Sequence, residues 1–351
     1  MVAGCLPAYY KRQRWRWCSD HPSTAARNIG SVCEHGPLNH PLALLESGRK
    51  SLSAECPSLP VSTPNPLPPL PDWILIKPWL DQWLQEDLGR GDRVAQALWP
   101  QTSESATAVW VAKEAGVIAG LPIAAQVFQR LDPQSHWEAL VAEGDRVAPG
   151  MAIARFEANT RALLSGERVA LNLTMRLSGI ATATRQLAEK IADLPAQLVD
   201  TRKTTPGLRL LEKYATRVGG AQNHRFGLDD AAMIKDNHIQ AAGGIAAAVR
   251  RVRAQIPYPL SIEVETSNLT EVAIALDCGV EIIMLDNMPV EMMQQAVQAI
   301  RQRGDHVKIE ASGNITLPTI RAVAVTGVDY ISTSAPITRS SWLDLSMRLP
   351  S

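Results

Sequence analysis

The chain has 351 residues, of which 46% are hydrophobic and 20% are charged, and its formal net charge is +0. This composition is typical of a globular protein with two or three domains. A balanced charge produces no overall field that would favour nucleic acid or a membrane surface, and no apolar run approaches the roughly 20 residues of a membrane-spanning helix. We therefore expect neither partner. The five cysteines contain no CxxC pair, which disfavours a zinc site. Only Cys278 lies outside the first 56 residues, which disfavours a disulfide framework and indicates a reducing compartment, the cytoplasm.

The first segment, residues 1–70, is rich in proline and ends within the run PNPLPPLP. It has no persistent helical or strand period, which predicts a disordered extension ending in a stiff polyproline linker. It also lacks the apolar core of a secretory signal. The cluster KRQRWRW could contact nucleic acid or a membrane, but a solvated tail or a start codon assigned too early is the simpler interpretation. A plastid transit peptide is a further alternative.

Residues 71–178 mix helical and strand patterns, which predicts a sheet packed with helices. The stretch KPWLDQWLQEDLG places its apolar residues on one helical face, with Pro78 near the first turn, and PIAAQVFQRL is a second helix. The stretch SATAVWVAKEAGVIAGLP predicts a hairpin that turns at residues 114–116. The alternating segment that follows predicts strands with turns at Gly144 and Gly150.

From residue 179 to residue 335 the pattern becomes a β-α repeat. A helix, IATATRQLAEKIADL, precedes six short apolar runs that are separated by helical stretches. These runs are AQLVD, AAMIK, LSIEVE, EIIMLD, VKIEASG and VDYISTSA. The alternation predicts a parallel sheet, most simply an α/β barrel, although fewer than the usual eight strands are visible. The last segment, residues 336–351, could return to the N-terminal domain.

Polar residues follow the apolar runs where the strands of the predicted barrel would end. The carboxyl ends of barrel strands share one rim, which is the face where active sites form. A His-Arg pair also lies in the chain between the runs AQLVD and AAMIK. The residues concerned are Thr201, Arg202, Lys203, His224, Arg225, Lys235, Glu265, Asp286, Ser312, Gly313, Asn314, Thr333, Ser334 and Ala335.

This rim predicts a site for a polyanion. Clustered cations suit a polyanionic substrate, while Glu265 and Asp286 suit Mg²⁺ that arrives with a diphosphate. The Ser312-Gly313-Asn314 turn offers free backbone N–H groups to a phosphate. Taken singly, each residue has a structural alternative, because a cation after a strand is usually solvated and a carboxylate there often caps a helix.

Two further patterns are weighed against this interpretation. Lys235 could form a Schiff base, as in a barrel aldolase, but that chemistry favours a pocket of low charge. Thr205 and Pro206 are interpreted as the N-cap and first residue of a helix that ends at Gly219-Gly220. That helix is predicted to bury three side chains, Leu210, Leu211 and Tyr214.

Taken together, these motifs resemble the quinolinate phosphoribosyltransferase family from about Trp73 to the C-terminus. The motifs are EDLGRGD, ALLSGERVALN, LSGIATAT, DTRKTTPGLRLLEKYA, GGAQNHRFGLDDAAMIKDNHI, EVE, LDNM, EASGNI and GVDYIS. The resemblance implies an α/β sandwich domain followed by an open, seven-stranded α/β barrel. It also implies a homodimer with shared active sites and a Mg²⁺-dependent reaction of quinolinate with phosphoribosyl diphosphate. The products would be nicotinate mononucleotide, diphosphate and CO₂. A transferase for another anionic ring and a phosphometabolite sensor are the competing interpretations.

The resemblance also implies roles for individual residues. Arg202, Arg225 and Lys235, with His224, would hold the two carboxylates of quinolinate. Arg168 would enter from the neighbouring subunit. Phosphoribosyl diphosphate and its Mg²⁺ would be addressed by Lys203, Glu265, Asp286, Ser312 and Gly313, of which the first three are the predicted catalytic residues.

Two departures from the family pattern are Arg93, where a Thr is common, and Ser334, where a Gly usually contacts the 5′-phosphate. No role is assigned to His238.

Overall fold

The computed structural model describes residues 67–101 and 104–349. The predicted disorder of residues 1–70 and the cationic cluster KRQRWRW therefore lie outside the described residues, except for residues 67–70, which have no regular secondary structure. No helix of the described part is both long enough and apolar enough to cross a membrane.

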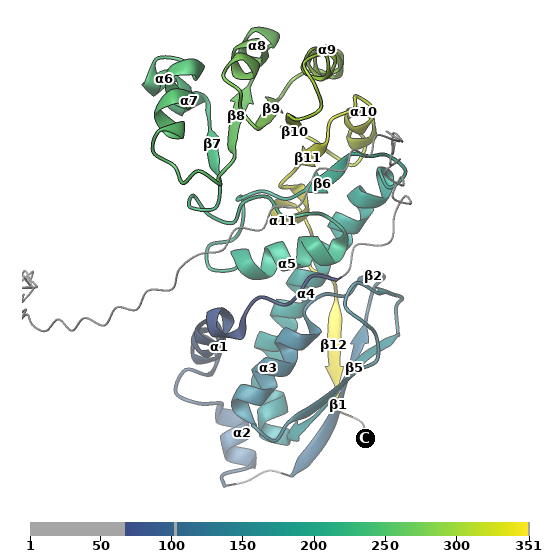
Figure 1. Cartoon of the computed structure of the whole chain (residues 1–351). Helices are drawn as coiled ribbons and strands as arrows, with labels where there is room; N and C mark the ends of the chain where they lie inside the picture. Colours follow the sequence, from purple (N-terminus) through teal and green to yellow (C-terminus); the bar gives the residue numbers. More distant parts are fainter. Residues whose placement is uncertain (1–66, 102–103, 350–351) are drawn as a thin grey trace, which may run out of the picture. The chain divides into compact units, whose positions relative to one another are not determined.

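The N-terminal elements form a four-stranded antiparallel sheet, with strand order β12-β1-β5-β3, and helices packed on it (Figure 1). Its strands are β1 (Ser105–Ala112), β3 (His136–Ala139), β5 (Ala152–Asn159) and β12 (Leu345–Arg348). Two short strands, β2 (Gly116–Val117) and β4 (Arg146–Val147), pair separately. The helices are α1 (Trp73–Leu88), α2 (Arg93–Leu98) and α3 (Leu121–Leu131).

An aromatic cluster fills the core between this sheet and α3. The rings of Trp110 on β1 and Phe128 on α3 both contact Phe156 on β5, each with ring centroids 4.9 Å apart. All three side chains are fully buried. Burial of such large rings dominates the hydrophobic stabilisation of a core. The strand β12 comes from the last residues of the chain and pairs with β1, so the C-terminal segment lies in the N-terminal sheet.

Two local predictions for this region are wrong. The predicted hairpin at residues 114–116 does not form, because β1 pairs with β5 and β12 while β2 pairs with β4. Alternating apolar residues specify strands, but they do not specify which strands pair. In addition, Pro78 lies inside α1, because the helix begins five residues earlier, where Asp72 accepts a hydrogen bond from the N–H of Ile74.

One helix, α4 (Thr160–Lys190), runs through residue 179, where the sequence pattern predicts the start of a new segment (Figure 1). The predicted helix IATATRQLAEKIADL is therefore only its C-terminal half. The helix packs against α3 with one part and against α5 (Arg209–Gly219) with another. A Cβ at Gly179 would lie 2.0 Å from the carbonyl oxygen of Ser341. The change in pattern thus marks a change in packing partner rather than a break in the helix.

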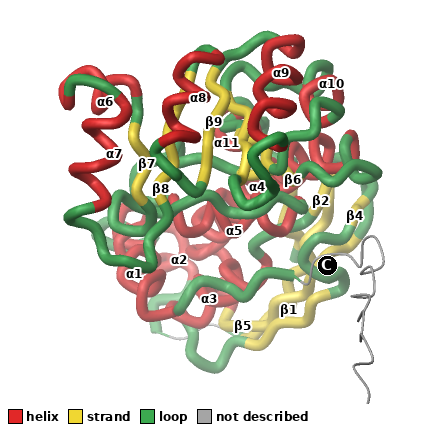
Figure 2. The backbone as a smooth tube through the Cα atoms, turned by 45° about the horizontal axis from the view of Figure 1, so that its top comes forward, coloured by secondary structure: helices red, strands yellow, loops and turns green. Residues whose placement is uncertain are grey.

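The six predicted barrel strands are confirmed as a parallel sheet with the order β6-β11-β10-β9-β8-β7 (Figure 1), of which Figure 2 labels β6, β7, β8 and β9. The strands are β6 (Gln197–Val199), β7 (Ala232–Ile234), β8 (Ile262–Thr266), β9 (Ile282–Asp286), β10 (Lys308–Ser312) and β11 (Tyr330–Ser332). The implied seventh strand is reduced to a parallel bridge between Val199 and Gln222. No ladder in the described residues joins Gln222 to β7, so the barrel is open there.

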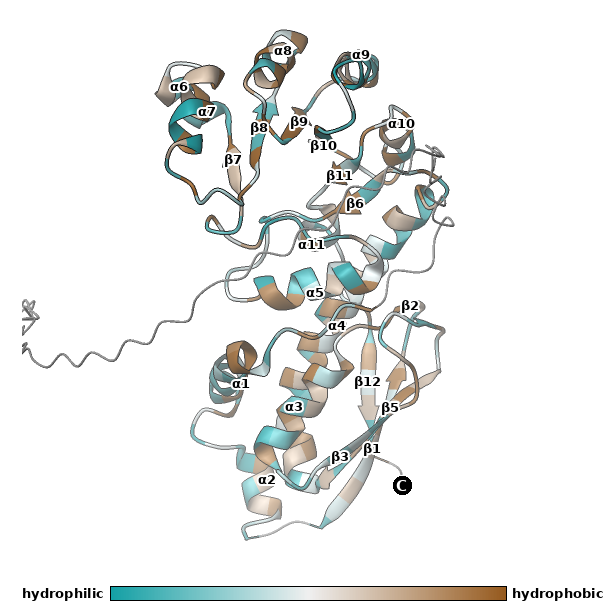
Figure 3. Cartoon of the chain, viewed as in Figure 1, coloured by the Kyte–Doolittle hydropathy of each residue, from teal (hydrophilic) through white to brown (hydrophobic). Residues whose placement is uncertain are grey.

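Helices cover the outer face of this sheet and leave its carboxyl ends free. They are α6 (Asp236–Ala242), α7 (Ile245–Arg253), α8 (Leu269–Asp277), α9 (Val290–Arg301) and α10 (Ile320–Ala324). A short helix, α11 (Ala335–Thr338), follows β11. Figure 3 shows both hydrophilic and hydrophobic stretches on α7, whose buried side chains are Ile245, Ala248 and Val249. One apolar stripe on each helix is enough to cover a strand.

The predicted N-cap of the helix after β6 is wrong. The helix α5 begins at Arg209, four residues after Thr205. The N–H and Oγ1 of Thr205 both donate to Glu212, each at 2.8 Å. A buried carboxylate thus replaces the capping geometry that Thr-Pro usually indicates. The predicted end is confirmed, because Gly220 caps α5 with a φ of 107°. Leu211 and Tyr214 are buried as predicted, whereas Leu210 is half-buried.

Candidate active site

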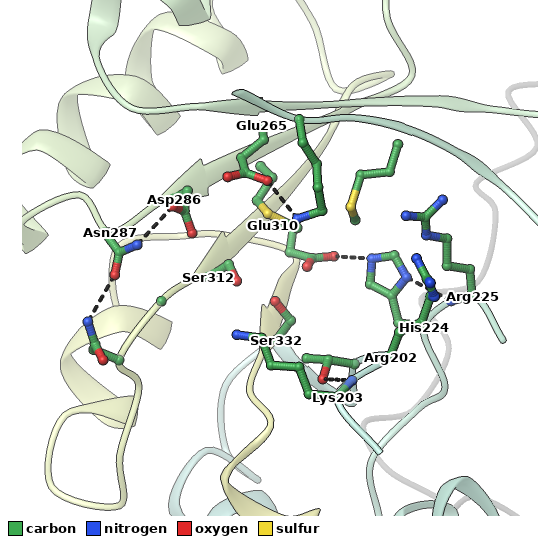
Figure 4. A pocket seen from close by; sticks show the side chains of 16 residues that line it. Arg202, Lys203, His224, Arg225, Glu265, Asp286, Asn287, Glu310, Ser312 and Ser332 are labelled. Carbon is green, nitrogen blue, oxygen red and sulfur yellow. Dashed lines mark hydrogen bonds and ion pairs between the residues drawn. The ribbon is translucent and has the colours of Figure 1, made fainter. Parts of the chain in front are cut away.

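The carboxyl ends of the barrel strands surround a pocket of about 530 Å³ (Figure 4). Eleven of the predicted site residues line it. They are Thr201, Arg202, Lys203, His224, Arg225, Lys235, Glu265, Asp286, Ser312, Gly313 and Asn314. The strand-end pattern therefore brings together in space residues that are up to 113 positions apart, from 201 to 314.

A smaller pocket of about 130 Å³ shares Lys203, Ser312 and Ser332 with the larger one. The three remaining rim residues, Thr333, Ser334 and Ala335, line this second pocket. No Asp or Glu is among its lining residues, whereas Lys203 and Arg339 both are. The buried hydroxyl of Ser332 has no hydrogen-bond partner among the described residues. Cations and a free donor without a carboxylate are suited to a phosphate group.

Arg168 is the one predicted site residue that lines neither pocket. Its side chain is exposed on α4. A residue that enters the site of a neighbouring subunit would be expected to lie outside the pocket of its own chain. The contribution of Arg168 across an interface stays a prediction.

His224 is fixed by two buried carboxylates that the sequence analysis missed. Its Nε2 lies 3.2 Å from Glu263 and 3.4 Å from Glu310, and its Nδ1 accepts a hydrogen bond from the backbone N–H of Arg225 at 2.7 Å. Glu263 precedes Glu265 by two residues on β8, and Glu310 precedes Ser312 by two on β10. Alternate residues of a strand share a face, so this spacing was the available signal.

The two carboxylates favour the protonated form of His224. Burial by itself would lower the pKa of His224, but Glu263 and Glu310 raise it to about 10. The pKa of Glu263 is raised as well, chiefly by burial. The backbone N–H of Arg225 is directed at Nδ1, so Nε2 is the ring nitrogen that faces the two carboxylates. These three residues could also ligate a metal ion, and the second carboxylate oxygens, Glu263 Oε1 and Glu310 Oε1, are buried with no hydrogen-bond partner among the described residues.

A second buried cluster holds the loop that carries His224 and Arg225. Lys213 of α5, which is 0% exposed, forms an ion pair with Asp200 and donates to the carbonyl oxygen of His224 at 2.8 Å. Asp200 also accepts from the N–H of His224 at 2.8 Å and from Asn223 Nδ2 at 2.6 Å. Burial lowers the pKa of Lys213, against the field of Asp200. No pattern in the sequence indicates that this helical lysine turns inward.

The two arginines of the cationic wall have different environments. Arg225 is 9% exposed and donates to the carbonyl oxygen of Ala231 at 2.8 Å, and burial lowers its pKa. The Nε of Arg202 is buried with no partner among the described residues. A guanidinium fork with a free buried donor favours a bound carboxylate.

The carboxylate wall lies across the pocket (Figure 4). Glu265 forms an ion pair with Lys235 Nζ at 2.9 Å, and Asp286 accepts a hydrogen bond from Asn287 Nδ2 at 2.8 Å. Carboxylate oxygens are the donors that Mg²⁺ prefers, so this pair fits a magnesium ion that arrives with a diphosphate. A Cβ at Gly313 would lie 2.2 Å from Asn287 Oδ1, which explains the glycine in this turn.

Three residues that the sequence left open also have structural positions. His238 Nδ1 accepts from the N–H of Lys235 at 3.0 Å and so caps α6. Arg93 is an exposed residue at the start of α2. Ser334 precedes α11, and its carbonyl oxygen accepts from the N–H of Ile337 and Thr338.

Comparison with known proteins identifies the family to which these features belong. A family model named Quinolinate phosphoribosyl transferase, N-terminal domain, matches residues 92–178, and the C-terminal domain model of the same name matches residues 180–348. The chain belongs to the quinolinate phosphoribosyltransferase family. The division between the two models falls inside α4.

Relatives and solved structures agree with this assignment. The chain is 60% identical over 289 residues to a probable carboxylating nicotinate-nucleotide pyrophosphorylase of Synechocystis, and the match covers 82% of this chain and 97% of that protein. A protein of Bacillus subtilis with the same description is 42% identical over 78% of this chain and 92% of its own length. The structure of NadC from Streptococcus pyogenes matches with a TM-score of 0.76 and 40% identity, covering 80% and 98% of the two chains.

Proposed function

We propose that this member of the family transfers the phosphoribosyl group from phosphoribosyl diphosphate to quinolinate. The products are nicotinate mononucleotide, diphosphate and CO₂, a step of NAD biosynthesis. One observation carries the proposal. The main pocket has a cationic wall opposite a carboxylate wall, and it adjoins a second pocket whose lining contains no carboxylate. This arrangement suits a dianionic ring, a metal-bound diphosphate and a terminal phosphate at the same time.

Quinolinate is proposed to bind against the cationic wall. Arg202, Arg225 and Lys235 would pair with its two carboxylates, because forked guanidinium groups match carboxylates with two parallel hydrogen bonds. The buried cluster around His224 fixes the edge of this wall before the substrate arrives. Preorganised charges stabilise a bound anion without a reorganisation cost.

Phosphoribosyl diphosphate is proposed to lie between Lys203 and the carboxylate wall. Glu265 and Asp286 would hold Mg²⁺, which supplies charge neutralisation for the diphosphate when bound. The ring nitrogen of quinolinate forms a bond to the ribose carbon while the bond to diphosphate breaks. Lys203 would stabilise the charge of the leaving group, and the two carboxylates would favour the cation-like ribose in the transition state.

Decarboxylation follows from the charge created by this transfer. Once ribosylated, the ring nitrogen is cationic, so the electron pair of the C2–carboxylate bond can remain at C2 as CO₂ leaves. A proton then replaces CO₂ at C2. The protein needs to release the 2-carboxylate from its cationic partners into a less polar environment.

The active unit is proposed to be a homodimer in which Arg168 of one subunit completes the site of the other. Subunits that carry Arg168→Ala are inactive in this account, as are subunits that carry Arg202→Ala. On mixing, each heterodimer should contain one intact site, so activity should return to roughly a quarter of the wild-type value if subunits exchange at random. No recovery after exchange has been verified would contradict a shared site.

The enzymatic proposal is tested with purified protein and Mg²⁺. Nicotinate mononucleotide should form from quinolinate and phosphoribosyl diphosphate, and nicotinate should be a poor substitute for quinolinate. Binding of both substrates without product would overturn the proposal, and preference for nicotinate would indicate a transferase for another ring.

Location in the cytoplasm is proposed from the cysteine pattern of the sequence, and cell fractionation with an antibody to the chain tests it.

A further inference from the structure

The smaller pocket is lined by the turn after β10, at residues 312–315, and by two further loops that lie far apart in the sequence. Thr201 and Lys203 come from the loop after β6, whereas Thr333, Ser334 and Arg339 come from the segment after β11. These two strands are neighbours in the sheet, so their loops face each other across the pocket. The distance between the loops sets the width of the space in which a phosphate would be held.

One arginine on α4 contacts both sides of this arrangement. Arg176 donates two hydrogen bonds to Glu212 Oε1, at 3.1 and 2.8 Å. The same guanidinium donates to the carbonyl oxygen of Ile337 at 2.7 Å and to Ser340 Oγ at 3.2 Å. Ile337 belongs to α11, the short helix between the predicted phosphate loop and Arg339.

Glu212 carries the connection to the other loop. Its side chain is 0% exposed and accepts hydrogen bonds from the N–H and Oγ1 of Thr205, both at 2.8 Å. Thr205 lies two residues after Lys203. Arg176, whose side chain is 15% exposed, and the buried Glu212 therefore form one continuous bridge from the loop of Lys203 to the segment that leads to Arg339.

The quinolinate wall is held by other groups. The loop of His224 and Arg225 is fixed by Asp200 and Lys213. The backbone carbonyl of Arg202 accepts a hydrogen bond from Arg209, whose Nε also donates to Thr204 at 3.0 Å. A defect in the Arg176–Glu212 bridge should thus alter the smaller pocket more than the cationic wall.

We propose that Arg176 and Glu212 are positioning residues that set the spacing of the phosphate pocket. The inference rests on the proposed function, because it assumes that the ligand of this pocket is the terminal phosphate of phosphoribosyl diphosphate. Neither residue touches the substrate. The bridge acts by holding Lys203 and Arg339 at the separation at which both cations reach one phosphate.

The test compares Arg176→Lys with a matched control, Arg185→Lys. Arg185 also lies on α4 and also donates to α5, through the carbonyl oxygens of Val218 and Gly219 at 3.1 and 3.0 Å, but it contacts neither loop. Arg176→Lys should raise KM for phosphoribosyl diphosphate about tenfold and change KM for quinolinate less than about twofold. Arg185→Lys should leave both KM values unchanged. Equal increases in both KM values for Arg176→Lys, or no increase, would overturn the inference.

A second variant separates positioning from stability. Arg176→Lys leaves a buried carboxylate with a poorer partner, so its free energy of unfolding in urea should fall. The double variant Arg176→Met with Glu212→Gln removes both charges and should recover much of this stability while keeping the raised KM for phosphoribosyl diphosphate. A double variant with a wild-type KM would show that the bridge is only structural.

These outcomes are distinct from failure of the proposed function. If wild-type protein formed no nicotinate mononucleotide, the enzymatic proposal would fail. The bridge would then be judged by thermal protection with Mg²⁺ and phosphoribosyl diphosphate, which should be weaker for Arg176→Lys than for Arg185→Lys. Equal protection of the two variants would overturn the bridge.

Discussion

The two walls of the main pocket differ in how their charged groups are held. On the cationic wall, His224 and Arg225 are fixed by the buried groups Asp200, Lys213 and Glu263. On the opposite wall, Glu265 and Asp286 make one short contact each, to Lys235 and to Asn287. A rigid, planar dianion benefits from a fixed wall, whereas a metal-bound diphosphate can draw adjustable carboxylates into place. The comparison predicts that changes behind the cationic wall affect stability, and that changes on the carboxylate wall affect catalysis alone.

The largest effect is expected behind the cationic wall. Lys213→Met leaves Asp200 as a buried charge without its cationic partner, which should lower the free energy of unfolding by about 3–5 kcal/mol. Urea denaturation at pH 7 measures this change. The double variant Lys213→Met with Asp200→Asn serves as the control and should be more stable than the single variant. A single variant as stable as the wild type would contradict the role assigned to this pair.

On the carboxylate wall, Asp286→Asn should lower kcat/KM by about 10²–10³ and leave the unfolding free energy within about 0.5 kcal/mol of the wild type. The reason is that Asp286 is proposed to act on the metal and the developing charge rather than on the fold. Steady-state kinetics and urea denaturation of the same preparation measure both quantities. A large loss of stability would erase the proposed difference between the walls.

The shape of the guanidinium is predicted to matter at Arg225. Arg225→Lys keeps the charge but loses the planar fork, so KM for quinolinate should rise about tenfold or more. Initial rates with quinolinate varied at saturating phosphoribosyl diphosphate test this expectation. An unchanged KM would indicate that Arg225 supports the loop through Ala231 and does not bind the substrate.

The His224 cluster should make stability depend on pH. The pKa of His224 in the folded chain, about 10, is above its usual value of 6.5. Its stabilising contribution is therefore fully present below pH 6.5 and is lost as the pH rises through 10. His224→Gln should flatten the curve of unfolding free energy against pH between these values. An identical curve for the variant would show that the proton of the cluster resides elsewhere.

The smallest effect is expected at Arg93, the departure from the family pattern that lies far from both pockets. Because its side chain is exposed at the start of α2, Arg93→Thr should change the unfolding free energy by less than about 0.5 kcal/mol and leave kcat/KM unchanged. A loss of activity in this variant would indicate a role for Arg93 at a subunit interface.

Sequence reasoning located the rim of the barrel because the carboxyl ends of its parallel strands all lie on one rim. Residues that follow predicted strands could therefore be placed together in space. It missed the groups behind the rim. Asp200, Glu212 and Lys213 turn inward because of tertiary contacts with other elements, and neither the strand pattern before Asp200 nor the helical period around Glu212 and Lys213 encodes those contacts. The hairpin at residues 114–116 failed for a similar reason. The strand β1 pairs with β5 and with β12, of which β12 is more than 200 residues away, and no local pattern specifies such pairings.

The most direct test of the central claim is the product balance of the wild-type enzyme with quinolinate labelled in its 2-carboxylate. In the presence of Mg²⁺ and phosphoribosyl diphosphate, labelled CO₂, nicotinate mononucleotide and diphosphate should appear in equal amounts. Retention of the label in the product, or absence of product while both substrates bind, would contradict the claim that this pocket joins the ring to the ribose and then releases the carboxylate.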